Sequence, residues 1–304
     1  VTRSIAVDTI TVTSANTFWD TTKTVVVSTA GDFSGKPVGA TEITSSDFDS
    51  TLNTHKTDNG GQVRILYRDD ETFTCSAFTG LNQTGPWMVG RFGNGTNPPT
   101  VALAAGVTAL TCSGTDGRID DITFDGGGDG TTRFIQFLLG ASQITLTGGS
   151  WQNMGNAINL SEASLIGDQI FLKEPSIGPL FGGNGNNGLY FAARNSGCMG
   201  MTVLDTTGGE HGFRTQFLQR SVLNNNSFGP APATKKSLTI RGPNFSGTAI
   251  YPAGSYTELV VCNDNIVTPD VLQISPCQIA PNATSADERI RNVIFENNHL
   301  KKDP

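Results

Sequence analysis

The residues best suited to chemistry lie between Gly208 and Arg220. This span contains a carboxylate at Glu210, one of only three histidines at His211, and two arginines at Arg214 and Arg220. Carboxylates and imidazoles transfer protons, and guanidinium groups hold anions. The same residue types also form plain surface contacts, in which Glu210 and Arg214 pair and His211 fills a turn. The sequence leaves both interpretations open.

The composition indicates which elements must position these residues. Of 304 residues, 36 are Gly and only 15% are charged, while 37% are apolar. The charged fraction is well below the usual quarter, and Thr, Ser and Asn are frequent. Such a chain is poor in helix formers and rich in residues of strands and tight turns. We therefore expect an all-β protein with enough apolar residues for a core.

The charge balance limits the partners. A net charge of −7 argues against nucleic acid, because phosphate neutralisation needs a basic surface, yet a local basic patch could still hold an anion. No apolar run approaches the roughly 20 residues that a membrane span needs. The chain opens on Val1-Thr2-Arg3 without a signal peptide, so we expect a mature or trimmed chain. We expect a secreted or cell-surface location.

The cysteines have no spacing typical of a zinc site. Their number is odd, so at least one thiol lies outside any disulfide within the chain. Cys262 and Cys277 are the predicted pair. No cofactor is expected; a calcium ion is possible, but no motif supports one. The five cysteines are Cys75, Cys112, Cys198, Cys262 and Cys277.

Residues 1–60 are predicted to form strands and a capping helix ahead of the main unit, residues 61–304. Residues 1–44 alternate β-branched and polar residues. Residues 45–49 then combine capping residues with acids in a first turn, which predicts a helix start, and Leu52 continues its apolar face. Such a helix could cover a sheet edge or one end of the core.

A motif recurs from residue 119 onward. It reads apolar, any residue, apolar, then four mostly Asn, Asp, Gly or Ser residues, then apolar, and its spacing indicates a period of about 20 residues. Repeats of this kind build a solenoid whose coils bury their apolar faces against each other. The second apolar residues of the copies are Phe124, Leu146, Leu165, Val203, Leu223, Ile240, Val261 and Phe295.

The order of segments near the start of the repeats resembles a known group. A strand, an acidic turn and a second strand at 62–73 are followed by a Gly-Pro strand at 85–93 and by Pro-Pro-x-Val at 98–101. This order resembles the first coils of right-handed parallel β-helix proteins, the pectin-lyase-like group. The resemblance implies a single-stranded right-handed parallel β-helix whose groove holds a polymer.

A second apolar series follows the first by 10–12 residues and includes Ile158, Phe213, Ile250 and Leu272. If these side chains point inward, the next residue of each strand points outward. An arginine flanked by tyrosines on neighbouring coils suits sugar binding, although ordinary exposed residues would give the same pattern. The predicted outward row is Asn159, Tyr190, Arg214, Tyr251 and Gln273.

Cleavage of a uronic-acid polysaccharide by β-elimination needs a cation for the carboxylate, a base for the adjacent proton and an acid for the leaving oxygen. Arg214 suits the first role because its planar fork matches a carboxylate. His211 or Lys236 could be the base, and Tyr251 the acid. The predicted catalytic residues are Arg214, His211, Lys236 and Glu210, and the predicted substrate-binding residues are Tyr190, Tyr251, Arg241, Lys235, Arg220 and Asn159.

The segment from Gly208 to Arg214 also resembles the Asn-Gly-Gly-Glu-x-x-Arg element of the alginate lyase and chondroitinase B-like family. Gly208, Gly209, Glu210 and Arg214 are the matching positions. Thr207 stands in place of the Asn, and Arg214 falls one residue late. The resemblance implies a polysaccharide lyase acting on an anionic polymer.

Two other functions fit the sequence. A glycoside hydrolase would use two carboxylates, such as Asp205 and Glu210, on either side of the scissile bond. Asp120 and Asp121 are adjacent on a strand, so only one of them could enter a groove. A tailspike-like module could instead bind glycans without catalysis. The lyase is the favoured interpretation, with the polysaccharide, the mode of cleavage and the oligomeric state left open.

Overall fold

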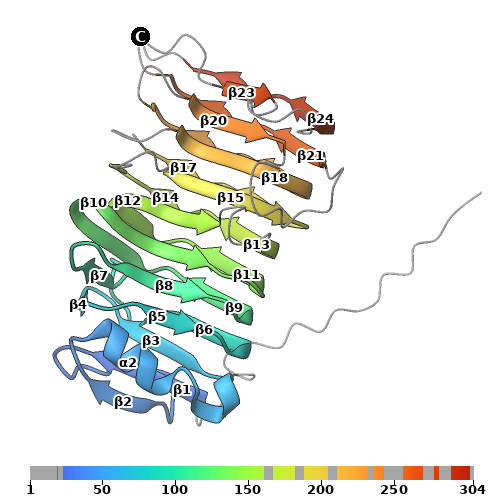
Figure 1. The fold of residues 1–304 in the computed structure, drawn as a ribbon. Helices are drawn as coiled ribbons and strands as arrows, with labels where there is room; N and C mark the ends of the chain where they lie inside the picture. The colour runs from blue at the N-terminus through green and yellow to red at the C-terminus, as the bar shows by residue number, and fades with distance from the viewer. Residues whose placement is uncertain are drawn as a thin grey trace, which may run out of the picture.

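The computed structural model describes residues 19, 23–160, 167–181, 188–204, 211–231, 236–242, 256–269, 277–280 and 289–301. Strands dominate these residues and α2 (Phe48–His55) is the one α-helix among them, so the all-β prediction is confirmed. Figure 1 shows the strands stacked from the N-terminal to the C-terminal end of the molecule. Every pairing recorded between these strands is parallel.

The strands form three faces, which we number by their order in one coil. The first face contains β3 (Arg64–Arg68), β6 (Thr84–Phe92), β9 (Thr115–Asp120), β11 (Ser142–Thr147), β13 (Gly167–Lys173), β16 (Gly197–Met199), the end of β18 (His211–Asn224), β21 (Thr257–Asn263) and β24 (Ile290–Glu296). The second face contains β4 (Thr72–Cys75), β7 (Thr100–Leu103), the starts of β10 (Thr123–Phe137) and β12 (Ser150–Leu160), β14 (Ser176–Ile177), β17 (Thr202–Val203), β19 (Ser227–Phe228), β22 (Ile266–Val267) and β25 (His299–Leu300). The third face contains β5 (Thr79–Leu81), β8 (Thr108–Cys112), the ends of β10 and β12, β15 (Leu189–Arg194), the start of β18, β20 (Lys236–Arg241) and β23 (Cys277–Ala280).

The N-terminal segment joins this stack directly. β1 (Thr24–Ser28) pairs with β2 (Thr41–Thr44) and with β3, and α2 precedes the 3-10 turn η2 (Asp58–Gly61). Asp47 caps α2 by accepting a hydrogen bond from the Ser50 N–H, which confirms the predicted helix start. The Phe48 ring lies 5.6 Å from that of Phe124, so the helix packs on the core. A domain boundary at residue 60 stays a prediction, and strand pairing continues across it.

The period of the coils differs from the predicted 20 residues. On the first face the paired residues Ile119, Leu146, Leu172, Cys198, Leu223, Cys262 and Phe295 are separated by 27, 26, 26, 25, 39 and 33 residues. The second apolar residues of the predicted motif copies lie on different faces. Phe124 pairs with Trp151 on the second face, and Ile240 pairs with Thr215 on the third. Apolar and polar residues alternate in the same way on every face, so the motif combined residues of different faces into one series with too short a period.

Two columns of residues with positive φ mark the boundaries of the first face. Small polar residues tolerate this conformation best, which explains why Asn, Asp and Gly recur in the chain. The column after the first face is Asp121, Gly148, Glu174, Gly200, Asn225, Asp264 and Asn297. The column near its start is Asp116, Gln143, Gln169, Asn195, Arg220, Leu259 and Asn292.

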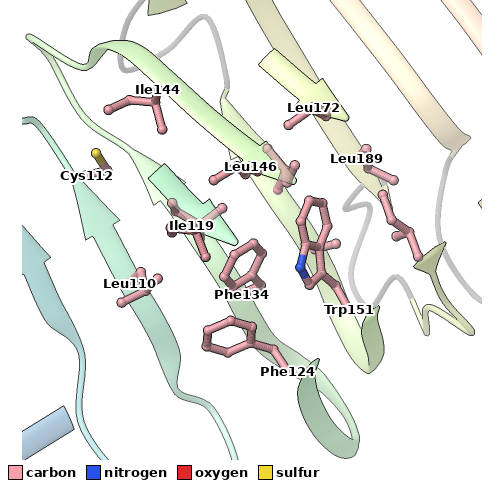
Figure 2. Close-up of a cluster of buried hydrophobic side chains, with 14 of the residues drawn as sticks. Leu110, Cys112, Ile119, Phe124, Phe134, Ile144, Leu146, Trp151, Leu172 and Leu189 are labelled. Carbon is pink, nitrogen blue, oxygen red and sulfur yellow. The ribbon is translucent and has the colours of Figure 1, made fainter. Parts of the chain in front are cut away.

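Apolar side chains from all three faces fill the interior. Figure 2 shows Ile119, Leu146, Leu189 and the aromatic residues packed between the faces. The Phe134 ring lies 4.3 Å from that of Phe124 and 4.7 Å from that of Trp151. Contacts of this kind stabilise the folded state beyond what the burial of the aromatic surface alone contributes. The core runs along the stack and contacts α2 at one end.

A column of buried asparagines ties the last coils together. The Asn226 Nδ2 donates to the Cys198 carbonyl at 3.0 Å and to the Asn265 Oδ1 at 2.9 Å. The Asn265 Nδ2 repeats the pattern on the Leu223 carbonyl at 2.9 Å and on the Asn298 Oδ1 at 2.8 Å. These buried amides are therefore paired with the neighbouring coil, as buried polar groups must be.

The predicted Cys262–Cys277 disulfide is wrong. Cys262 is a buried, free thiol, as are Cys75, Cys112 and Cys198. Cys262 lies on β21 of the first face and Cys277 begins β23 of the third face, so they are not paired across strands, although Cys277 is near enough across the interior to raise the pKa of Cys262. These thiols fill core positions instead.

The buried thiols predict a loss of stability at alkaline pH. Burial raises the pKa of Cys112, and burial with the charge of Cys277 raises the pKa of Cys262, each from 9.0 to about 12. The folded state thus keeps protons that the unfolded state loses. This contribution to stability is complete below about pH 9 and is lost between about pH 9 and 12. We expect urea unfolding free energies to fall from pH 9 to 11, and to fall less steeply in Cys112→Ala. An equal slope in both proteins would contradict this.

Candidate functional site

The third face carries one row of paired residues across seven strands, which we call the third-face row; its members are partly exposed except Thr239, which is fully buried. Asn159, Tyr190 and Arg214 are paired neighbours in it, as predicted. The predicted continuation is wrong, because β20 follows β18, so Thr239 pairs with Arg214. Tyr251 and Gln273 lie outside the described residues. The third-face row is Thr111, Gln136, Asn159, Tyr190, Arg214, Thr239 and Gln278.

Arg214 and Tyr190 form the centre of the third-face row. The guanidinium carbon of Arg214 lies 5.5 Å from the centroid of the Tyr190 ring, within cation–π range. Both side chains are half-buried, while their strand neighbours Phe213 and Leu189 are fully buried in the core. The inward side chains therefore fix the backbone from which Arg214 and Tyr190 face outward.

His211 and Lys236 are paired at the start of β18 and β20. The Lys236 backbone N–H donates to the His211 Nδ1 at 3.1 Å, and the Thr239 Oγ1 lies 3.3 Å from the same nitrogen. Because Nδ1 accepts a hydrogen bond, the neutral ring carries its proton on Nε2. The residue as a whole is only 6% exposed. In this tautomer the Nε2–H of His211 is a hydrogen-bond donor, and the ring has no free nitrogen to accept a proton.

The remaining predicted residues are dispersed. Arg241 ends β20 and is half-buried. Arg220 lies six residues beyond Arg214 on β18, past the corner where the strand leaves the third face for the first face. It is exposed, and its Nε donates to the Asn195 Oδ1 at 2.7 Å. The structure therefore separates Arg220 from the third-face row, while Glu210, Lys235 and Asp205 lie outside the described residues.

The acidic pair Asp120-Asp121 lies at the end of β9, on the first face. Asp121 has a positive φ, accepts from the Gly149 N–H at 3.1 Å and pairs with Arg91 at 2.8 Å. Burial, and then the charge of Asp121, raises the pKa of Asp120. Both acids therefore belong to a turn away from the third-face row.

A cavity that the sequence did not predict lies at the N-terminal end of the third-face row. It measures about 460 Å³ and is lined by Thr111 and Gln136 of the row and by Phe78 of the loop between β4 and β5. Phe78 is 64% exposed. An aromatic residue in the polar segment Ser76–Thr79 was the signal available in the sequence. The cavity extends the row with an aromatic surface.

Two further features of the described residues bear on the site. No three His, Cys, Asp or Glu side chains among them come together as metal ligands. In the same part of the chain no helix is long and apolar enough to cross a membrane. The expectation of no cofactor stays a prediction.

Comparison with known proteins gives only distant similarity. No family model matches the chain, and no curated protein matches it. The chain is similar to an alginate lyase from Paenibacillus sp. str. FPU-7, with 13% identity over 83% of this chain and 97% of that chain and a TM-score of 0.46. It is also similar to the A-module of the mannuronan C-5 epimerase AlgE4 from Azotobacter vinelandii, with 10% identity over 84% and 93% and a TM-score of 0.26. Both scores are below 0.5, so the assignments above rest on the strand registers alone.

Proposed function

We propose that this chain is a polysaccharide-cleaving enzyme, and specifically a lyase that acts on a uronic-acid polymer by β-elimination. The observation that carries the proposal is Arg214 seated against Tyr190 at the centre of the third-face row. A guanidinium in a chain of net charge −7 marks this row as a place for an anion. The aromatic ring beside it offers a surface for the sugar.

The length of the site favours a polymer over a small sugar. Four strand spacings separate Thr111 from Arg214, which amounts to about 19 Å along the stack. Polar side chains at Gln136 and Asn159 lie between them, and Phe78 lies beside the far end. This row could hold several consecutive sugar units, with the reacting unit at Arg214.

The chemistry follows from the groups near Arg214. Its guanidinium neutralises the uronate, so that the carbon beside the carboxylate can lose its proton. The electron pair left on that carbon forms a double bond as the glycosidic oxygen departs. Lys236, in its neutral form, is the proposed acceptor of the proton, and Tyr251 is the proposed donor to the leaving oxygen. His211, whose Nδ1 accepts from the Lys236 backbone N–H, and Glu210 remain in the proposed catalytic set.

The proposal also covers the handedness of the coils and the role of the N-terminal segment. The coils form one right-handed parallel β-helix, with the N-terminal strands and α2 as its cap. The burial of Phe48 and Leu52 against the end of the core supports a capping role. The protein acts outside the cell or at its surface, where polysaccharides are found.

The reaction is tested with a panel of anionic and neutral polysaccharides. Each is scored for new ultraviolet absorbance from unsaturated ends and for new reducing ends. We expect both signals together, and only on a uronic-acid polymer, because elimination creates a double bond at each break. Reducing ends without absorbance would replace the lyase by a hydrolase. Binding without either signal would replace the enzyme by a glycan-binding module.

A further inference from the structure

A second hollow lies on the first face, away from the third-face row. It measures about 340 Å³ and crosses β9, β11 and β13. Because the two sites lie on different faces of the stack, a ligand in this hollow would not touch Arg214. Its lining residues are Asp116, Arg118, Gln143, Thr145, Gln169 and Phe171.

The strand register builds this hollow as a regular array. Arg118, Thr145 and Phe171 are paired across the three strands. Two residues earlier on the same strands stand Asp116, Gln143 and Gln169, all with positive φ. Each strand therefore supplies two side chains, repeated about every 4.8 Å along the stack.

The glutamines are the strongest indication of a ligand. Gln143 and Gln169 belong to the positive-φ column near the start of the first face, with φ values of 58° and 57°, a conformation that the whole column shares. Both are exposed, and within the described part of the chain neither side-chain amide has a hydrogen-bond partner. Each amide can donate and accept at once, which matches a pair of neighbouring hydroxyls.

The other lining residues indicate a neutral ligand. Arg118 and Asp116 approach to 3.9 Å, so their charges offset each other. The half-buried Phe171 supplies an apolar surface at the end of the array, and Thr145 adds a hydroxyl. Apolar rings with a few polar groups around them are typical of ligand sites. A sugar presents an apolar ring face and hydroxyl edges, which fits this set.

We propose that the hollow on the first face binds a neutral saccharide segment without cleaving it. This inference rests on the proposed function in one respect, namely that the natural ligand is a polysaccharide. A second contact on another face would hold the enzyme on its polymer while the third-face row acts on an anionic stretch. Affinity for extended polymer then rises through the effective concentration of the tethered site.

The test measures binding of cello-, manno- and xylo-oligosaccharides of about four to six units by titration calorimetry. We expect the wild-type protein to bind at least one of them. The double variant Gln143→Ala/Gln169→Ala should weaken binding about tenfold, as expected for losing two net hydrogen bonds. Phe171→Ala should weaken it similarly. Asn292→Ala, which removes an exposed amide from the same column outside the hollow, should bind as the wild type does.

The outcomes separate this inference from the proposed function. Arg214→Ala should lose cleavage and keep neutral-oligosaccharide binding. Binding at the hollow in a protein that cleaves no polymer would sustain the inference and overturn the enzyme. Cleavage without any binding of neutral oligosaccharides would overturn this inference and sustain the proposed enzyme. Unchanged binding in the double variant, or a preference for anionic oligosaccharides that Arg118→Ala abolishes, would also overturn a neutral saccharide site.

Discussion

Arg214→Ala is expected to lower the rate of polysaccharide cleavage by about 10²- to 10³-fold, because it removes the charge that stabilises the developing anion. Arg214→Lys keeps the charge but loses the planar fork, so it should recover only part of the rate. The fold should tolerate both changes. The contact with Tyr190 that is lost contributes about 0.5–1 kcal/mol at a partly exposed site. The measurement is the initial rate of ultraviolet absorbance, together with urea unfolding of each variant.

Arg220→Ala is the matched control for this experiment. Arg220 lies on the same strand and is exposed, but it belongs to the positive-φ column rather than to the third-face row. We expect it to cleave at the wild-type rate. If Arg220→Ala lost activity while Arg214→Ala kept it, the active face of the stack would be the first and not the third.

Phe213→Ala should lower stability, whereas Arg214→Ala should lower activity with little effect on stability. Phe213 is fully buried, and its ring lies 5.4 Å from that of Phe228 and 6.2 Å from that of Phe191. Truncation leaves a cavity between the faces and should lower the free energy of unfolding by about 3–5 kcal/mol. Urea denaturation measures this loss. The residual activity should follow the folded fraction.

Phe78→Ala serves as the stability control, because its side chain is 64% exposed. We expect its unfolding free energy to change by less than about 0.5 kcal/mol. A small loss in Phe213→Ala would mean that β18 has the reverse orientation. Arg214 would then face the core, and the proposed site would fail with it.

Local patterns in the sequence predicted the parts of the fold that depend on local rules. The start of α2 followed from Asp47 and the acids behind it, because capping involves residues close in sequence. The row Asn159, Tyr190, Arg214 followed from strict alternation next to buried apolar residues. These inferences needed no knowledge of the period.

The failures came from features that alternation cannot distinguish. Phe124 and Ile240 were placed in one series although they lie on different faces, because inward residues look alike on each. The continuation of the third-face row then moved from residue 251 to Thr239. The hollow on the first face was also missed. Its two glutamines have positive φ, and a left-handed residue interrupts the alternation from which orientation is inferred.

The asparagine column bears on the order in which the coils unfold. Each amide bonds only to the two adjacent coils, so these hydrogen bonds stabilise contacts between nearest neighbours along the stack. The last described coil has a neighbour on one side only, and its Phe295 and Leu300 are 41% and 66% exposed. Among the described coils we therefore expect local opening to reach β24 and β25 before it reaches β18. One coil, formed by β20, β21 and β22, separates the coil of Arg214 from that last coil, so opening of β24 and β25 alone leaves the proposed active site intact.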